Sequence, residues 1–338
     1  MNNFLFKIAT SIVHAKTKAE EFDAGKAYAD FLNSLTFPET CYSDEETTLT
    51  GGVALSPLQA ANCALEHIRT VRFIKGTYLA ILELFKRFPH EQLNILYAGT
   101  GPFATIILPV LSLLPQASLS LTLLDISSQS VKSVKSLFSQ LGFNSFVSEI
   151  LHTDAITYTY PSAKNLHMVI SETMFEALNR EPQIAITANL AKQICKDGIL
   201  IPEQINIDLL YADFNSEPNL QISNESDLIL SNTSFKERVV LAKSVLSLDL
   251  NNNFSDCGQE KIHYTPWFTT SSLSFSVPDL CLFTTVKVWD HVVIHSSQST
   301  ITNPVCISSF HTLNQFGSFR LYYSFQHIPQ WSIEYRKD

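Results

Sequence analysis

A glycine turn followed by an acidic residue is the feature of this sequence best suited to chemistry. Gly99 and Gly101 come directly after the apolar run 95–98, and Asp125 ends a second apolar run, 121–124. Glycine has no Cβ, so the chain can bend sharply there and its backbone can approach a ligand closely. A carboxylate at the tip of the neighbouring parallel strand is well placed to accept hydrogen bonds from both hydroxyls of a ribose. This pattern predicts a cofactor that contains a nucleoside.

The elements that must position these residues follow from the alternation of apolar runs with helical stretches. Apolar runs at 93–98, 119–124 and 166–170 predict buried strands, and the stretches 128–141 and 182–195 have helical character. Such alternation is typical of a doubly wound, parallel α/β sheet. We therefore expect a Rossmann-like sheet with the candidate residues at the carboxyl ends of its strands.

The flanking regions differ in texture. Residues 1–90 are predicted to be helical, with Ser56-Pro57 starting a helix that continues to Phe88. Gly51-Gly52 predicts a tight turn or a loop that folds over a ligand. After Ile199, short alternating segments predict an antiparallel β domain, either a barrel or a sandwich. The predicted regions are thus 1–90, 91–203 and 204–338.

A third acidic residue narrows the choice of cofactor. The dinucleotide-binding fingerprint has a third glycine, whereas Gly101 is followed by Pro-Phe-Ala, and Asp154-Ala155 come later. The order of strand, G-x-G turn, strand ending in Asp, and Asp-Ala loop resembles the class I S-adenosylmethionine-dependent methyltransferases. The resemblance implies that Gly99 and Gly101 face the methionine part of the cofactor. It also implies that Asp125 binds the ribose hydroxyls and that Asp154 binds the adenine amino group.

One residue departs from that family's pattern. Tyr97 stands where an acid is usual, so the methionine amino group must be contacted by another group or through water. An ordinary α/β core with an incidental G-x-G turn remains the alternative. The predicted cofactor-binding residues are Tyr97, Gly99, Thr100, Gly101, Asp125, Ile126, Asp154 and Ala155.

A pair of glutamates follows the strand 166–170. Glu172 comes after Ser171, and Glu181 is nine positions further on. This segment resembles the double-glutamate loop of the protein arginine methyltransferases, and 199–202 continues the likeness with an Ile/Pro strand that enters the β domain. The resemblance covers residues 65–335 in order, although its specific motifs lie between 95 and 203.

Two carboxylates have a direct chemical use in such a site. Together they can hold a planar guanidinium through several donors, localise its charge and aim the remaining nitrogen at a methyl group. We therefore predict Glu172 and Glu181 as the catalytic residues. The alternatives are structural: Glu181 precedes Pro182 and suits a helix start, and Glu172 could hydrogen-bond neighbouring backbone.

The likeness to arginine methyltransferases is incomplete. Their Thr-His-Trp loop, which closes the acceptor pocket, has Thr302-Asn303-Pro304 as its nearest counterpart, without imidazole or indole. Their helical dimerisation arm is not evident in 213–237, which is polar and irregular. Either Arg69 or Arg72 is a candidate for the family's helix arginine that meets the cofactor carboxylate. The acceptor is thus expected to be a small molecule or peptide, and a homodimer is left open.

Composition excludes several other classes. The net charge of -9 without a basic cluster argues against nucleic acid as a partner. Six cysteines without a C-x-x-C pair indicate neither a zinc site nor a disulfide framework, and favour a reducing compartment. His291 and His295 lie in strand-like sequence, too far apart to share an ion, so no metal is expected. With no membrane-length apolar run, we expect a cytoplasmic protein.

The sequence therefore predicts an S-adenosylmethionine-dependent methyltransferase that acts on a nitrogen or oxygen held at the carboxyl edge of the sheet, under the β domain. A non-catalytic, cofactor-binding regulatory module of the same fold is the first alternative, motivated by Tyr97 and the missing Thr-His-Trp loop. An NAD-dependent oxidoreductase is the second, disfavoured by the absent third glycine. Three tryptophans are assigned to packing, with an acceptor-pocket role as the alternative: Trp267, Trp289 and Trp331.

Overall fold

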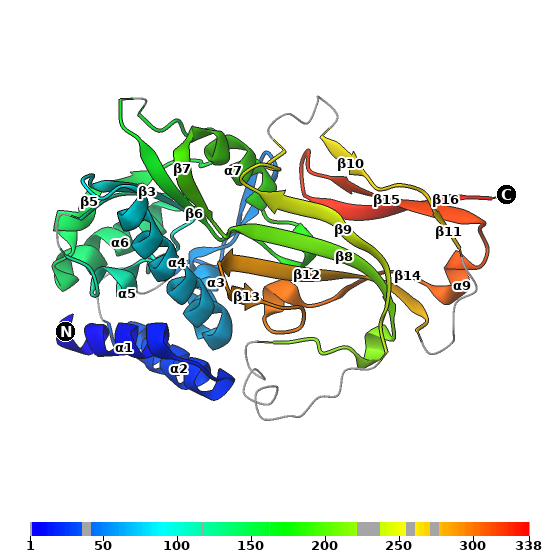
Figure 1. The fold of residues 1–338 in the computed structure, drawn as a ribbon, viewed down its shortest axis with the longest axis horizontal. Helices are drawn as coiled ribbons and strands as arrows, with labels where there is room; N and C mark the ends of the chain where they lie inside the picture. Colours follow the sequence, from blue (N-terminus) through cyan, green and yellow to red (C-terminus); the bar gives the residue numbers. More distant parts are fainter. Residues whose placement is uncertain are drawn as a thin grey trace.

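A five-stranded parallel sheet forms the centre of the N-terminal half of the molecule (Figure 1). The computed structural model describes residues 2–35, 42–115, 118–161, 163–221, 237–254, 261–270 and 277–337. The sheet order is β5-β4-β3-β6-β7, with strands β3 (Leu93–Ala98), β4 (Leu119–Asp125), β5 (Val147–His152), β6 (Leu166–Ser171) and β7 (Ile194–Ile201). Strand order reverses between β3 and β6, and ligands of such sheets bind beside that point, at the carboxyl ends. The predicted doubly wound sheet is confirmed.

The strands of this sheet explain the apolar runs in the sequence. β3, β4 and β6 are buried along almost their whole length, because helices cover both faces of a parallel sheet. The covering helices include α5 (Leu108–Leu111), α6 (Ser128–Leu141) and α7 (Gln183–Leu190). The predicted helix 182–195 is too long, since Ile194 already pairs with Leu166 in the ladder between β7 and β6.

The N-terminal region is not helical throughout. It contains α1 (Asn2–His14), α2 (Lys18–Ser34), α3 (Pro57–Asn62) and α4 (His67–Arg87), but also a hairpin of β1 (Thr47–Leu49) and β2 (Gly52–Ala54). The hairpin forms because Thr47 and Thr48 are β-branched, and because Gly51 and Gly52 adopt φ values of 111° and 154°. The long helix predicted from Ser56 is broken between α3 and α4, where Glu66 leaves helical geometry.

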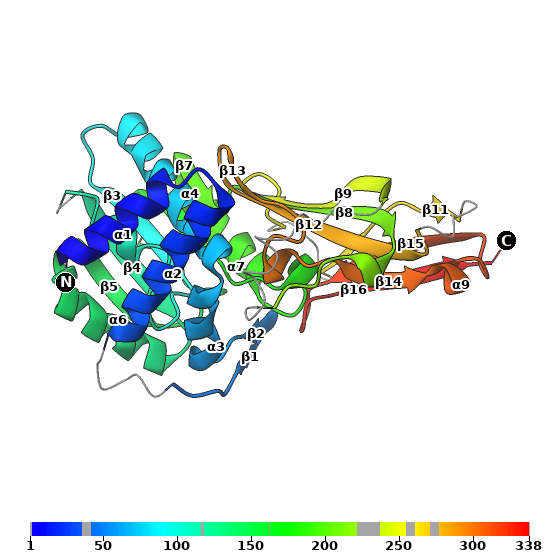
Figure 2. The same cartoon turned by 90° about the horizontal axis from the view of Figure 1, so that it is seen from below.

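The C-terminal half consists of two antiparallel sheets, which Figure 2 shows as two layers. The first contains β8 (Gln204–Ala212), β9 (Val239–Asp249), β12 (Asp279–Trp289), β13 (Val292–Ile294) and β14 (Val305–Ser309). The second contains β10 (Ile262–Tyr264), β11 (Phe268–Thr269), β15 (Ser318–Ser324) and β16 (Gln330–Arg336). The predicted antiparallel β domain is therefore confirmed, and α9 (Phe310–Leu313) connects β14 to β15.

Short turns complete the fold. They are η1 (Cys63–Leu65), η2 (Asn144–Phe146), η3 (Glu176–Leu178), η4 (Ala191–Gln193), η5 (Phe214–Ser216) and η7 (Thr300–Thr302).

One buried core includes residues from all three predicted regions, such as Ile12, Leu121 and Phe319. The boundaries at 90/91 and 203/204 therefore stay a prediction. Residues 222–236, most of the segment compared with a dimerisation arm, lie outside the described ranges.

Candidate active site

A cavity opens at the carboxyl ends of β3, β4 and β6 and encloses about 1010 Å³, part of it open to solvent. All ten residues predicted as site residues line it: Tyr97, Gly99, Thr100, Gly101, Asp125, Ile126, Asp154, Ala155, Glu172 and Glu181. The hairpin of β1 and β2 adds Leu49 and Ala54 to its wall. Among the described residues, every one that lines the cavity lies between Leu49 and Ile186, so the β domain contributes none.

The glycine turn after β3 is a tightly packed floor of the cavity. Gly99 and Gly101 have φ values of 73° and 57°, which L side chains rarely adopt. A Cβ at Gly99 would lie 2.5 Å from Cγ2 of Thr173, in the loop that carries the first glutamate. Glycine is therefore needed here both for the backbone conformation and for the approach of a neighbouring loop.

Asp125 joins this turn to the end of β4. Its carboxylate accepts hydrogen bonds from the backbone N–H groups of Gly101 and Ser127, each at 2.8 Å. Burial raises the pKa of Asp125 to about 6, although these N–H groups favour the charged form and oppose the shift. A buried carboxylate thus faces the cavity at the tip of the strand beside the glycine turn.

A second acidic group and several apolar side chains form the wall beyond Asp125. Oδ1 of Asp154 accepts a hydrogen bond from the backbone N–H of Ile156 at 2.8 Å. Ile126, Ala155 and Ile186 also line the cavity there. A flat apolar ring with a hydrogen-bond donor at its edge would find suitable partners in this part.

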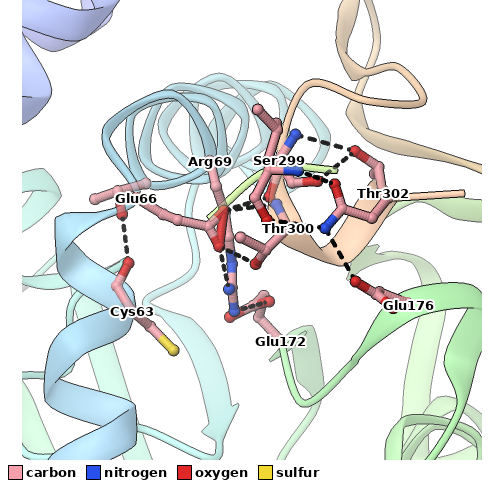
Figure 3. Close-up of polar contacts among 11 residues, drawn as sticks. Cys63, Glu66, Arg69, Glu172, Glu176, Ser299, Thr300 and Thr302 are labelled. Carbon is pink, nitrogen blue, oxygen red and sulfur yellow. Dashed lines mark hydrogen bonds and ion pairs between the residues drawn. The ribbon is translucent and has the colours of Figure 1, made fainter. Parts of the chain in front are cut away.

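Arg69 and Glu172 also line the cavity, and they form a buried ion pair there (Figure 3). Arg69 comes from α4, and its second contact is Oε1 of Glu66, at 3.1 Å. Glu66 in turn accepts hydrogen bonds from Oγ of Ser299 at 2.6 Å and from the backbone N–H of Thr300 at 3.0 Å. A chain of charge-assisted contacts therefore connects the β domain to Glu172.

The two glutamates have different surroundings. Burial raises the pKa of Glu172, and the adjacent Arg69 guanidinium opposes that shift. Burial also raises the pKa of Glu181, to about 8, and the negative charge of Glu172 adds to the effect. No hydrogen bond to the Glu181 carboxyl is found within the described part of the chain, so this group is available to a ligand.

Tyr97, which is buried, and Cys63, which is half-buried, also line the cavity. Burial raises the pKa of the Tyr97 hydroxyl well above its ordinary value, and the nearby Glu172 charge adds to this. Burial raises the pKa of the Cys63 thiol to about 12. Both groups are therefore neutral at physiological pH and act as polar surface, not as charges or nucleophiles.

The loop between the two glutamates has an unusual backbone. Ala177, Leu178 and Arg180 have φ values of 50°, 62° and 68°. None of them is glycine, and such left-handed conformations cost on the order of 1–3 kcal/mol each for other residues. They persist only when surrounding contacts hold them, so the contacts of this loop are part of the site.

Most of those contacts come from the β domain. The indole N–H of Trp331 donates to the carbonyl of Ala177 at 2.9 Å, and the Tyr323 hydroxyl donates to the carbonyl of Leu178 at 2.5 Å. The Asn303 amide donates to Oε1 of Glu176 at 3.0 Å, which joins the counterpart of the Thr-His-Trp loop to the glutamate loop. The β domain thus shapes the cavity from outside.

Of the comparisons with known proteins, only the one between structures finds matches. No family model and no curated protein sequence matches this chain. A crystal structure of PRMT6 matches with a TM-score of 0.55 at 12% identity, over 82% of this chain and 99% of that chain. A PRMT6-SAH structure matches with a TM-score of 0.50 at 12% identity, over 79% and 96%. The chain has the protein arginine methyltransferase fold.

A third match, a Trypanosoma brucei PRMT1 enzyme-prozyme complex with AdoHcy, has a TM-score of 0.47 at 12% identity, over 78% of this chain and 94% of that chain. At such identities, likeness to the arginine methyltransferase fold says nothing of which residues act. The resemblance inferred from the motifs between 95 and 203 nevertheless agrees with the fold of the whole molecule.

Within this arginine methyltransferase fold, the structure separates two arginines that the sequence left equivalent. Arg69 lines the cavity, whereas Arg72 is not among its lining residues and forms an ion pair with Glu21 of α2 at 2.8 Å. Arg72 also donates to the carbonyl of Val293 in β13 at 3.0 Å. Its role is to join α2, α4 and the β domain.

Sequence reasoning missed the residues that support the site from a distance. Glu66, Tyr323 and the Ser299–Thr300 pair were not singled out, and Trp331 was assigned to packing. No spacing signal could have found them, because Glu66 and Thr300 meet only in the folded chain.

Among the described residues, there is no cluster of three or more His, Cys, Asp or Glu side chains suited to a metal ion. None of the helices in those ranges has the length and hydropathy of a membrane span.

Proposed function

We propose that this protein is an S-adenosylmethionine-dependent methyltransferase that acts on a nitrogen or oxygen of a small molecule or peptide. The observation that carries the proposal is that one cavity contains the glycine turn, Asp125, Asp154 and both glutamates. The cavity lies at the point where strand order reverses, which is where this class of sheet binds ligands. The matched PRMT6-SAH structure contains SAH, the demethylated product of the same cofactor, which supports the choice.

The residues present fit this cofactor. Asp125 is placed to accept the ribose hydroxyls, Asp154 to accept the adenine amino group, and the apolar wall with Ile126 and Ala155 to cover the ring. Among the described lining residues, Arg69 is the cation that suits the methionine carboxylate. When bound, S-adenosylmethionine would supply an electrophilic methyl group to the acceptor lone pair, with its sulfonium sulfur as the leaving group.

The two glutamates have separate parts in this proposal. Glu172, held by Arg69, is a fixed acceptor that orients an N–H or O–H group of the substrate. Glu181 lacks a hydrogen-bond partner among the described residues, and burial places its pKa at about 8, near the working range of a general base. In its ionised form Glu181 takes the proton that the acceptor loses when it is methylated.

A non-catalytic cofactor-binding module is the second candidate. Two observations favour it: the Arg69 guanidinium already pairs with Glu172, and Asn303 binds Glu176 where the family has a histidine-containing loop. Such a module would bind the cofactor and transfer nothing. A nicotinamide-dependent oxidoreductase lacks comparable support, since the glycine turn carries only two glycines.

Titration calorimetry tests the cofactor. We expect S-adenosylhomocysteine to bind and NAD not to bind, and Asp125→Asn to weaken binding of S-adenosylhomocysteine at least tenfold, because a carboxylate that accepts two ribose hydroxyls is lost. Asp30→Asn, at an exposed position of α2, is the matched control and should bind like wild type. Binding of NAD alone would overturn the proposal.

Transfer of labelled methyl from S-adenosylmethionine into size-fractionated cell extract separates enzyme from binding module. We expect label in acceptors of small molecular mass, and loss of transfer in Glu172→Gln with affinity for S-adenosylhomocysteine within a few-fold of wild type. Glu149→Gln, on the exposed part of β5, is the control for this change. Cofactor binding without any transfer would favour the module.

A cytoplasmic location belongs to the proposal as well, and a homodimer is left open. The sedimentation coefficient of the purified chain, measured over a range of concentrations, would give its oligomeric state.

A further inference from the structure

The β domain reaches the active site only through other parts of the protein. It contributes no lining residue among those described, yet it contacts the loop 176–181 that ends at Glu181. Its other connection to the cavity goes through Glu66 to Arg69. Any effect of the β domain on the reaction therefore depends on how it holds the loop 176–181 and the Glu66 side chain that contacts Arg69.

The loop 176–181 has internal backbone hydrogen bonds, from the N–H groups of Asn179 and Glu181 to the carbonyls of Glu176 and Asn179, and further contacts with its surroundings. The carbonyls of Ala177 and Leu178 accept hydrogen bonds from Trp331 and Tyr323. The N–H of Arg180 donates to the carbonyl of Pro329 at 2.7 Å, in the turn between β15 and β16. These three contacts flank the three left-handed residues, so they hold the backbone where it is least favourable by itself.

The two side-chain donors are themselves rigid. Tyr323 is fully buried and Trp331 is 8% exposed. Their ring centroids lie 5.2 Å apart, and Tyr323 also stacks on Phe325 at 6.1 Å. Because packing fixes both rings, their N–H and O–H groups present donors at fixed positions, and the loop must adopt the matching conformation to bind them.

We propose that Trp331 and Tyr323 are positioning residues for Glu181, because they lock the loop 176–181 in the left-handed conformation that places the Glu181 carboxyl in the cavity. The proposal rests on the proposed methyltransferase function. It assigns the β domain the role of a template for the general base Glu181, in place of a wall of the acceptor pocket.

Loss of either donor should loosen the loop and admit water to Glu181. The pKa of Glu181, about 8 because of burial, should then fall toward the ordinary value of a glutamate. The charged groups that face it are Glu172, Arg69, Arg180 and Glu46. Glu172 and Arg69 lie outside the loop and remain in place, whereas Arg180 belongs to the loop and moves with it. Cofactor affinity should stay unchanged, since Asp125, Asp154 and the glycine turn lie on other loops.

The test uses two variants that remove one donor each and keep an aromatic ring at the position. They are Trp331→Phe and Tyr323→Phe. The matched controls are Trp289→Phe, on β12, whose ring contacts Arg87, and Tyr335→Phe, which loses a hydrogen bond of 2.7 Å to Ser308 inside the β domain. Each protein is measured by thermal unfolding, calorimetry with S-adenosylhomocysteine, steady-state transfer and carbon-13 NMR titration of labelled glutamate, with Glu181→Gln to assign the signal.

We expect kcat to fall about tenfold in Trp331→Phe and Tyr323→Phe, with the Kd for S-adenosylhomocysteine within twofold of wild type. We also expect the Glu181 titration to move down by at least one pH unit in these variants and not in the controls. An unchanged titration, or losses no larger than those of Trp289→Phe and Tyr335→Phe, would overturn the proposal. If either Trp331→Phe or Tyr323→Phe unfolds, the remaining one is compared with the controls in the same way.

The NMR titration keeps this proposal distinct from the proposed function. If wild-type protein transfers no methyl group, the methyltransferase assignment fails, whereas a downward shift of the Glu181 titration in the loop variants would still show that the β domain sets its position. If transfer occurs and the titration does not move, the methyltransferase assignment stands and the positioning role is wrong.

Discussion

At the scale of single residues, the cavity separates two chemically identical side chains by their partners. Glu172 has a guanidinium beside it, and Glu181 has none within hydrogen-bonding distance among the described residues. The free energy of moving a carboxylate from water into a buried site is large unless a cation or donors compensate it. One glutamate is therefore suited to orient a substrate, and the other to change its protonation state.

This difference predicts a pH dependence of stability. The pKa of Glu181 is about 8 in the folded protein, above its reference value of 4.5, so the unfolded state ionises first as pH rises. The free energy of unfolding should thus fall between pH 4.5 and pH 8 and then level off. Glu181→Gln removes this effect, and should be more stable than wild type by about 3–5 kcal/mol at pH 9 and no more stable at pH 4.5.

Urea unfolding at pH 4.5, 7 and 9 measures the effect. Glu149→Gln, at an exposed position of β5, is the control and should follow wild type throughout. A stability gain of Glu181→Gln that is equal at all three pH values would show that the carboxyl is not titrating in this range.

At the scale of elements, the hairpin of β1 and β2 forms a wall of the cavity, and the loop 176–181 holds this hairpin in place. The N–H of Val53 donates to the carbonyl of Arg180 at 2.8 Å, and the Arg180 side chain pairs with Glu46. Gly52 packs directly on the backbone of Glu181 and Pro182. The hairpin and the glutamate loop therefore form one mechanical unit.

Gly52→Ala should separate that unit. The added Cβ would lie 2.6 Å from the backbone nitrogen of Pro182, a clash that a rigid backbone can relieve only by moving the hairpin. Overpacking of this kind costs about 1–3 kcal/mol. We expect faster amide hydrogen exchange over residues 47–54 and weaker binding of S-adenosylhomocysteine.

Gly142→Ala provides the matched control. Gly142 ends α6 with φ of 72°, and no atom lies within 4 Å of a Cβ placed there. This variant should lose about 1–2 kcal/mol of stability from its backbone conformation alone, with unchanged exchange in the hairpin. Equal exchange over 47–54 in both variants would contradict the proposed unit.

At the scale of the whole molecule, α4 connects the three predicted regions. It packs on α1 and α2, on β7 of the parallel sheet, and on β12 and β13 of the β domain. Gly76 packs tightly against β12, since a Cβ there would lie 2.5 Å from Cγ1 of Val288. The same helix carries Arg69 into the cavity, so the site depends on the assembly of all three regions.

We therefore expect the protein to unfold in a single transition. Ile95→Ala in β3 and Phe319→Ala in β15 each remove a fully buried side chain of the same core and should cost about 2–5 kcal/mol. Both should lower the midpoint of one calorimetric transition, because the core is continuous between the two halves. Two separate transitions, with each variant shifting only its own, would show that the halves fold independently.

The sequence by itself determined the parallel sheet and the cofactor end of the cavity. β3 and α6 have the predicted bounds, 93–98 and 128–141, because a buried parallel strand is apolar along its whole length and a helix has clear end signals. The ten predicted site residues came together because the carboxyl ends of neighbouring parallel strands meet at one edge. Their roles in binding and catalysis remain predictions.

Only the tertiary structure decided how the acceptor end is held. It placed Arg69 in the cavity and Arg72 outside it, put a hairpin where helix was expected, and brought Trp331 and Tyr323 to the glutamate loop. These contacts join residues far apart in the chain, and burial makes each of them strong. Local sequence patterns record periodicity over a few turns or strands, so they cannot report contacts that arise only when two sheets and a helix close around a loop.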